Sequence, residues 1–166
     1  MASYNGITIK ALKKFKDHEG ISIAQGNIYI ENKKVGFWSQ DAWCGPDIVN
    51  LDPKYDERKL EEACAKRGQN LEITMYEALR LTEDEKDWKK SGWPRMFVAD
   101  DGVHVLQVRI ADPKMTVDDV LKIESVTDCI KESFFKDEDR YSYKIIDADS
   151  VDVGDPITLD EIRKGE

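Results

Sequence analysis

Isoleucines alternate with other residues along the first fifty positions, and this period of two constrains the fold more than any other feature. The pairs are Ile7 and Ile9, Ile21 and Ile23, and Ile28 and Ile30, and residues two apart lie on the same face of a strand. Between two of these runs stands Glu-Asn-Lys-Lys at 31–34, where Asn tolerates the left-handed backbone of a tight hairpin turn. The pattern predicts an antiparallel meander over about residues 6–50. We expect Val35 and Phe37 on one face of it and Trp38 on the other.

The hydrophobic period then changes from two to that of a helix. Asp52-Pro53 is typical of a helix start, because Asp accepts from free backbone N–H groups and Pro is favoured at the first helical position. Buried-type residues follow at helical spacing, and Gly68 is a typical helix end. The residues that share the predicted apolar face are Leu60, Ala63, Cys64 and Arg67.

A second helical stretch is predicted from Leu71, with Met75, Ala78 and Leu79 on one face. Thr82 and Glu85 form a capping-box pattern, which predicts a separate further turn or two ending near Gly92. The helical region therefore covers about residues 53–92.

The sequence of residues 94–147 predicts a hairpin, a helix and a strand. Two strand-like runs flank Asp101-Gly102, which is typical of a type I′ turn. Thr116 and Asp119 predict the start of a helix over about 117–135, and a strand follows near 140–147. A short last helix is expected over about 158–164, capped by Thr158 and Glu161.

These elements predict an α+β fold in which an antiparallel meander and a hairpin pack against three or four helices. The 166 residues suit one domain spanning 1–166. There is no apolar run of membrane-spanning length and no apolar region of the secretory type near residue 1. Cys44, Cys64 and Cys129 are widely spaced and form no CxxC pair, so we expect reduced thiols and a cytoplasmic protein.

Negative charge is concentrated in the last third of the chain. The whole chain carries net −9, and residues 111–166 hold 8 basic and 16 acidic side chains. Such a segment repels nucleic acid and anionic lipid, so we expect neither a direct nucleic-acid ligand nor a membrane. A positively charged partner would be attracted.

Aromatic side chains gather in residues 36–51, where Trp38 and Trp43 stand close to Cys44 and Gly45-Pro46. The first interpretation is a strand exit anchored by aromatic residues, which dominate cores. The second is a binding surface, since exposed Trp is a common energetic centre of interfaces. The third is a nucleophilic Cys44, which would need His18 or His104 as its base.

The first third of the chain combines a Glu-Gly step at 19–20 with Tyr29, the turn at residues 32–35, Asp41 and Gly45. With these residues, the stretch 7–52 resembles the start of small uncharacterised proteins of phages and plasmids. Cys44 stands where those proteins have the first Gly of a Gly-Gly pair, and Trp38 and Trp43 are additional. The resemblance implies an origin in a mobile genetic element and carries over no catalytic residue.

Other motifs that indicate chemistry are missing from the sequence. There is no zinc-type spacing, no phosphate-binding glycine loop, and the acidic run from Asp147 lacks the glycine and the glutamate of a calcium loop. We expect no cofactor and no metal.

The sequence therefore predicts a non-enzymatic accessory protein that acts by binding a protein, which would be basic or nucleic-acid-binding. One version is an acidic inhibitor of a nucleic-acid-binding host or defence protein. The alternatives are a self-associating structural component, which would be a homo-oligomer, and a small enzyme using Cys44 with a histidine. The predicted partner-binding residues are Trp38, Trp43, Asp137, Glu138, Asp139, Asp147, Asp149, Asp152 and Asp155.

Overall fold

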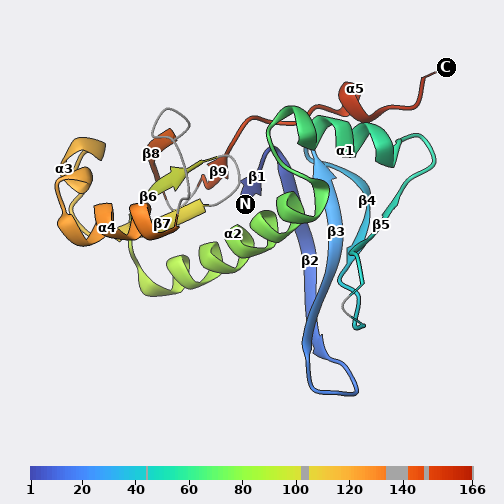
Figure 1. The fold of residues 1–166 in the computed structure, drawn as a ribbon, viewed down its shortest axis with the longest axis horizontal. Coiled ribbons are helices and arrows are strands. Elements are labelled where there is room, and N and C mark those ends of the chain that lie inside the picture. The colour runs from blue at the N-terminus through green and yellow to red at the C-terminus, as the bar shows by residue number, and fades with distance from the viewer. Residues whose placement is uncertain (44, 102–104, 134–141, 148–149, 166) are drawn as a thin grey trace.

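Two β-sheets and five helices make up the part of the chain that the structure describes. This structure is a computed structural model, and it describes residues 1–43, 45–101, 105–133, 142–147 and 150–165. The long helix α2 (Leu71–Ser91) runs between the two sheets (Figure 1). The predicted α+β class is confirmed.

The larger sheet has six strands in the order β5-β4-β3-β2-β1-β9. Their bounds are β1 Ser3–Tyr4, β2 Ile7–Lys16, β3 Ser22–Ile30, β4 Lys33–Ser39, β5 Ile48–Leu51 and β9 Asp152–Val153. Strands β2 to β5 are the predicted antiparallel meander, in which Ile7 pairs with Ile30 and Ile9 with Ile28, all four buried. Strand β9 lies parallel to β1, so the last part of the chain extends the sheet that the first part begins.

The turn between β3 and β4 follows the sequence prediction. Ile30 pairs with Lys33, and the two residues between them, Glu31 and Asn32, have φ of 48° and 61°. Both values lie in the left-handed region used by two-residue hairpin turns.

A β-bulge in β4 changes which residues face the core. Ile28 pairs with Gly36 and Tyr29 with Lys34, so Val35 is an extra residue in its strand. Val35 is fully buried whereas Phe37 is exposed. The prediction that these two side chains share an environment is therefore wrong, because the bulge interrupts the alternation on which it rested.

Helix α1 (Glu57–Lys66) begins later than predicted. Its N-cap is Asp56, whose carboxylate accepts a hydrogen bond from the Arg58 backbone N–H at 2.9 Å, so the predicted start at Asp52-Pro53 is wrong. The predicted face is confirmed for Leu60, Ala63 and Cys64, which are buried, and Gly68 follows the helix with φ of +80°.

Helix α2 begins at Leu71, as predicted, and continues without a break to Ser91 before the left-handed Gly92. The Thr82 hydroxyl donates to the Ala78 carbonyl at 2.7 Å, a bond made within a continuous helix. Thr82 therefore does not cap a separate helix, and that prediction is wrong.

The smaller sheet has the order β7-β6-β8, with β6 Arg95–Asp100, β7 Val105–Ile110 and β8 Ser142–Asp147. The predicted hairpin is confirmed, but Asp100 pairs with Val105, two residues beyond the pairing that a two-residue turn at Asp101-Gly102 would give. The turn residues 102–104 lie outside the described part of the chain.

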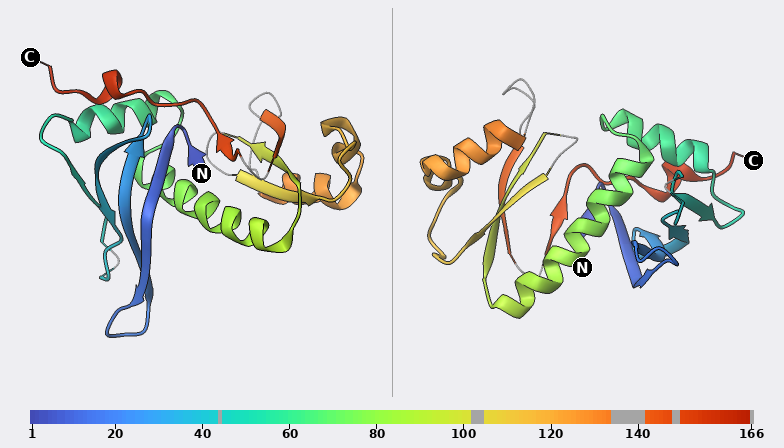
Figure 2. Two further views of the ribbon diagram at one scale, coloured as in Figure 1. Left: turned by 180° about the vertical axis from the view of Figure 1, so that it is seen from behind. Right: turned by 60° about the horizontal axis from the view of Figure 1, so that its bottom comes forward.

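Both faces of this smaller sheet are covered. Phe97 and Ala99 pack into a cluster with residues of α3 (Val117–Leu121) and α4 (Glu124–Ser133), whereas Met96 and Val98 join the core that includes α2. Figure 2 shows α3 and α4 on the side of the sheet away from α2.

The predicted helix over 117–135 is two helices, since α3 ends at Leu121 and α4 begins at Glu124. The capping box of Thr116 and Asp119 is present as predicted, and residues 134 and 135 lie outside the described part.

The last helix, α5 (Leu159–Ile162), has the predicted capping box of Thr158 and Glu161. Among the described residues, no helix combines the length and the apolar character needed to cross a membrane.

Arg67 fixes the C-terminal segment to α1. Its guanidinium donates to the carbonyl oxygens of Asp155 at 2.6 Å and Pro156 at 2.8 Å, and to the Glu161 carboxylate at 3.2 Å. The hydrogen bond from Arg67 is the main reason why the pKa of Glu161 lies below its usual value.

Candidate functional site

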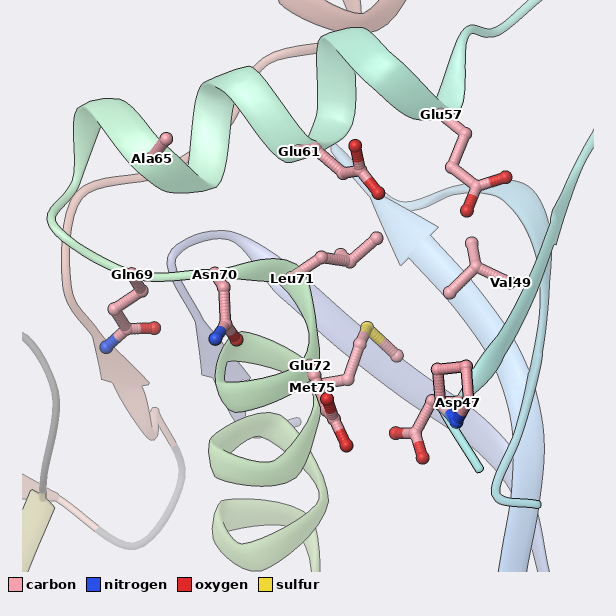
Figure 3. Close-up of a pocket in the computed structure, with 11 residues that line it drawn as sticks. Asp47, Val49, Glu57, Glu61, Ala65, Gln69, Asn70, Leu71, Glu72 and Met75 are labelled. Atoms are coloured by element: carbon pink, nitrogen blue, oxygen red, sulfur yellow. The ribbon is translucent and has the colours of Figure 1, made fainter. Parts of the chain in front are cut away.

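A groove opens between α1, the first turn of α2 and the strand β5, with a volume of about 590 Å³. Its floor is apolar and includes Val49, which is half-buried, and Leu71 and Met75, which belong to the buried core. Four carboxyl groups surround this floor, from Asp47, Glu57, Glu61 and Glu72 (Figure 3). Among its eleven lining residues there is no lysine, arginine or histidine.

The acidic side of the groove follows from the two faces of α1. Glu57 and Glu61 are four residues apart, so they lie one above the other on the same face of the helix. Leu60, Ala63 and Cys64 occupy the adjoining face of the helix and are buried against the core. Packing of that apolar face therefore turns the two glutamates toward α2 and β5, as Figure 3 shows.

A second wall of the groove is the start of α2. Asn70 caps this helix by accepting from the Ile73 backbone N–H at 2.7 Å, which places Glu72 in the first turn. A carboxylate in that position is favoured by the helix dipole. Leu71 is buried beside it and belongs to the main core.

Asp47 is held at the mouth of the groove by a buried tryptophan. The Trp38 indole N–H donates to the Asp47 carboxylate at 2.8 Å. Burial raises the pKa of Asp47 above its usual value, the Trp38 hydrogen bond acts in the opposite direction, and the nearby charge of Glu72 raises it further. A cation in the groove would offset, by attraction, the cost of burying this charge and its repulsion by Glu72.

The three glutamates of the groove are available for a ligand. Within the described part of the chain, no side chain forms an ion pair with Glu57, Glu61 or Glu72, and their carboxylates accept no hydrogen bond. The carboxyl groups also do not converge as metal ligands do, since no group of three or more His, Cys, Asp and Glu among the described residues could hold a metal ion. The groove therefore suits a ligand with a positive charge on an apolar stem, which is the chemistry of lysine and arginine side chains.

A buried polar network lies behind the groove, at the junction of the two sheets. Gln69, which lines the groove, donates to the Tyr4 hydroxyl, and the Thr74 hydroxyl donates to the Gln69 carbonyl oxygen at 2.8 Å. The Tyr4 hydroxyl in turn donates to Asp100 at 3.3 Å. Burial, and then the charge of Asp100, raise the pKa of Tyr4 well above its usual value. This network joins β1, β6 and α2, and its role is to fix the two sheets to each other.

The two tryptophans predicted as partner contacts have different environments. Trp38 is 0% exposed, so its ring is part of the core and the prediction that it contacts a partner is wrong. Its face of β4 packs inward, and its indole N–H is used by Asp47. Trp43 is 73% exposed, and its ring lies 4.8 Å from that of His18.

The predicted acidic contacts that fall in the described residues have separate partners. Asp147 lies 3.7 Å from the Arg95 guanidinium, Asp152 accepts from the Ser3 hydroxyl at 2.6 Å, and Asp155 lies 3.4 Å from Arg67. None of the three lines the groove. Asp137, Glu138, Asp139 and Asp149 lie outside the described residues.

The predicted cysteine chemistry falls largely outside the described residues as well, since Cys44 and His104 are not among them. Cys64 is buried in the main core, where burial raises the pKa of its thiol, and Cys129 is exposed on α4.

Sequence reasoning missed the groove because its four acidic residues come from three separate elements. The spacing of Glu57 and Glu61 was visible, as was the position of Glu72 directly after a capping Asn. What the sequence did not show is that α1 and α2 meet in front of β5, which depends on tertiary packing.

Comparison with protein-family models found no match, and comparison with curated proteins and with solved structures found none either.

Proposed function

We propose that this chain is a non-enzymatic binding protein whose groove receives a basic segment of a protein partner. The observation that carries the proposal is the composition of the groove: four carboxyl groups around an apolar floor, with no cation among its lining residues. Lysine and arginine have long apolar stems, which would cover Val49 and the exposed edge of Leu71 while their charged ends reach the carboxylates.

The size of the groove supports recognition of a short segment. Its volume of about 590 Å³ lies within the range of roughly 300–1,000 Å³ that is common for ligand pockets. That space accommodates a few side chains, so the partner would present an extended or protruding stretch. Basic stretches of this kind are frequent in nucleic-acid-binding proteins, which keeps inhibition of such a protein as one form of the proposal.

Peptide binding tests the proposal. The probes are labelled octapeptides of alternating Lys and Leu, alternating Lys and Ser, and alternating Glu and Leu, followed by fluorescence anisotropy. We expect the Lys-Leu peptide to bind best, the Lys-Ser peptide to bind more weakly because it leaves the floor uncovered, and the Glu-Leu peptide not to bind.

Matched variants locate the binding site. We expect the double substitution Glu57→Gln and Glu61→Gln to weaken Lys-Leu binding by about tenfold, which corresponds to about 1.4 kcal/mol. The control is Glu62→Gln with Glu132→Gln, which removes two exposed carboxylates outside the groove. Equal loss of binding in both doubles would show that overall charge, and not the groove, attracts the peptide, and would overturn the proposal.

A further inference from the structure

The hairpin of β2 and β3 carries three lysines and a phenylalanine at the end of β2, just before a polar turn that includes Asp17 and Glu19. These two strands extend further from the helices than the rest of the molecule (Figure 1). Their outer end carries Lys13, Lys14, Phe15 and Lys16, all exposed, and Phe15 is 43% exposed despite its size.

The lysines at this end of the hairpin differ in whether they have an ion-pair partner within the chain. Lys14 forms an ion pair with Glu83 of α2. Within the described residues, Lys13 and Lys16 have no ion pair or hydrogen bond from their side chains. Asp17 follows at the turn, where its carboxylate accepts the backbone N–H groups of Glu19 and Ile21 at 2.9 and 2.8 Å. The turn is thereby fixed, and the free charges before it are positive.

We infer that the groove is occupied by the β2–β3 hairpin end of a second copy of this chain. This inference rests on the proposed function of the groove. Lys13, on the same face of β2 as Phe15, supplies a positive charge to Glu57, Glu61 and Glu72 of the other copy, and Lys16 adds positive charge from the opposite face of the strand. Phe15 supplies an exposed apolar side chain for the accessible apolar part of the groove, at Val49 and the edge of Leu71.

The two surfaces are different, so the contact is heterologous. Each copy presents one hairpin and one groove, and such contacts join head to tail into rings or open chains. The net charge of −9 opposes association at long range, but at 0.15 M salt it is screened beyond roughly 8 Å. Direct charge contacts in the groove are shorter than that distance.

Sedimentation velocity at about 0.15 M salt, over a range of protein concentrations, tests this inference. The hairpin variant is Lys13→Glu with Lys16→Glu, which leaves the Lys14–Glu83 pair intact. The groove variant is Glu57→Lys with Glu61→Lys. Circular dichroism and thermal unfolding verify that both variants are folded.

We expect the mass of the unsubstituted chain to rise above 19.1 kDa with concentration. Each variant alone should remain at the monomer mass. An equal mixture of the two should form a discrete dimer and nothing larger, because only one intact hairpin and one intact groove can meet. A monomer at every concentration, or a mixture that does not associate, would overturn the inference.

The peptide experiment keeps this inference separate from the proposed function. The hairpin variant retains its groove and should bind the Lys-Leu peptide as the unsubstituted chain does. If the peptide binds in the groove while the unsubstituted chain stays monomeric, the proposed function stands and self-recognition is wrong. If neither binding nor association occurs, both are wrong.

Discussion

The two sheets of this molecule differ in how many of their faces are covered. In the smaller sheet, the central strand β6 has four successive buried apolar residues, Met96 to Ala99, because α2 covers one face and α3 and α4 cover the other. In the larger sheet, strands β2 to β5 bury one face, and the other carries exposed residues such as Lys13, Phe37 and Ile48.

The residue patterns of the strands reflect this difference in coverage. A strand covered on both faces is apolar without interruption, whereas a strand with one solvated face alternates. It also decides where binding can occur. The smaller sheet uses its surface for internal packing, whereas the larger sheet keeps an open hairpin and borders the acidic groove through Val49 of β5.

Truncation of one phenylalanine in each sheet should give the largest contrast. Phe97 is fully buried and stacks on Tyr143 with the ring centres 5.9 Å apart. We expect Phe97→Ala to lower the free energy of unfolding by about 3–5 kcal/mol. Phe37→Ala, on the open face, should change it by no more than about 0.5 kcal/mol. Urea unfolding measures both free energies. Similar losses for the two variants would show that the face carrying Phe37 is covered in solution.

Arg67 gives the next largest effect, because it holds the C-terminal segment that completes the larger sheet. Arg67→Met removes the donors to the carbonyls of Asp155 and Pro156 and to Glu161. The loss should be about 2–3 kcal/mol. Arg58→Met, on the exposed part of the same helix, is the control and should be nearly neutral in thermal unfolding.

Substitutions of Trp38 and Trp43 compare the stability effect of a buried tryptophan with that of an exposed one. Trp38→Phe keeps an aromatic ring but removes the N–H that Asp47 accepts, so we expect a loss of about 1–2 kcal/mol. The pKa of Asp47 should rise further, since that bond lowers it. Trp43→Phe should leave the urea midpoint unchanged. An equal effect at both positions would contradict the assigned burial.

The smallest effects concern pH, where two acidic residues should act in opposite directions. The pKa of Glu161 is lowered, so its stabilising contribution is present above the usual Glu pKa and is lost as pH falls through the lowered value. The pKa of Asp47 is raised, so its charge is unfavourable at neutral pH and the penalty disappears as pH falls through the raised value.

Two amide variants separate these contributions. Glu161→Gln should destabilise the protein at pH 7 and have little effect in acid. Asp47→Asn should be neutral or stabilising at pH 7, by less than about 1 kcal/mol, and lose that gain in acid. Thermal unfolding between pH 3 and pH 7 measures both, and the same sign for the two variants at pH 7 would contradict the account.

Local features of the fold were predictable from the sequence because they depend on neighbouring residues. The turn at Glu31-Asn32, the capping boxes at Thr116 and Thr158 and the start of α2 at Leu71 all follow from short-range rules. The bulge at Val35 did not, because it depends on the register between strands.

Long-range features were missed for a related reason. Thr82 and Glu85 have the spacing of a cap, but packing on both sides of α2 keeps that helix continuous. The pairing of β9 with β1 joins residues about 150 positions apart. Of the candidate site, the sequence predicted only an acidic surface, and it assigned that surface to acidic residues of the last third of the chain, none of which lines the groove.

An NMR titration of the isotope-labelled protein with the Lys-Leu octapeptide tests the central claim most directly. The account predicts that amide signals shift in α1, in the first turns of α2 and in β5 around Asp47 and Val49, while those of α3, α4 and the smaller sheet stay in place. Shifts confined to other surfaces, or spread evenly over the acidic residues of the molecule, would contradict a binding groove at this position.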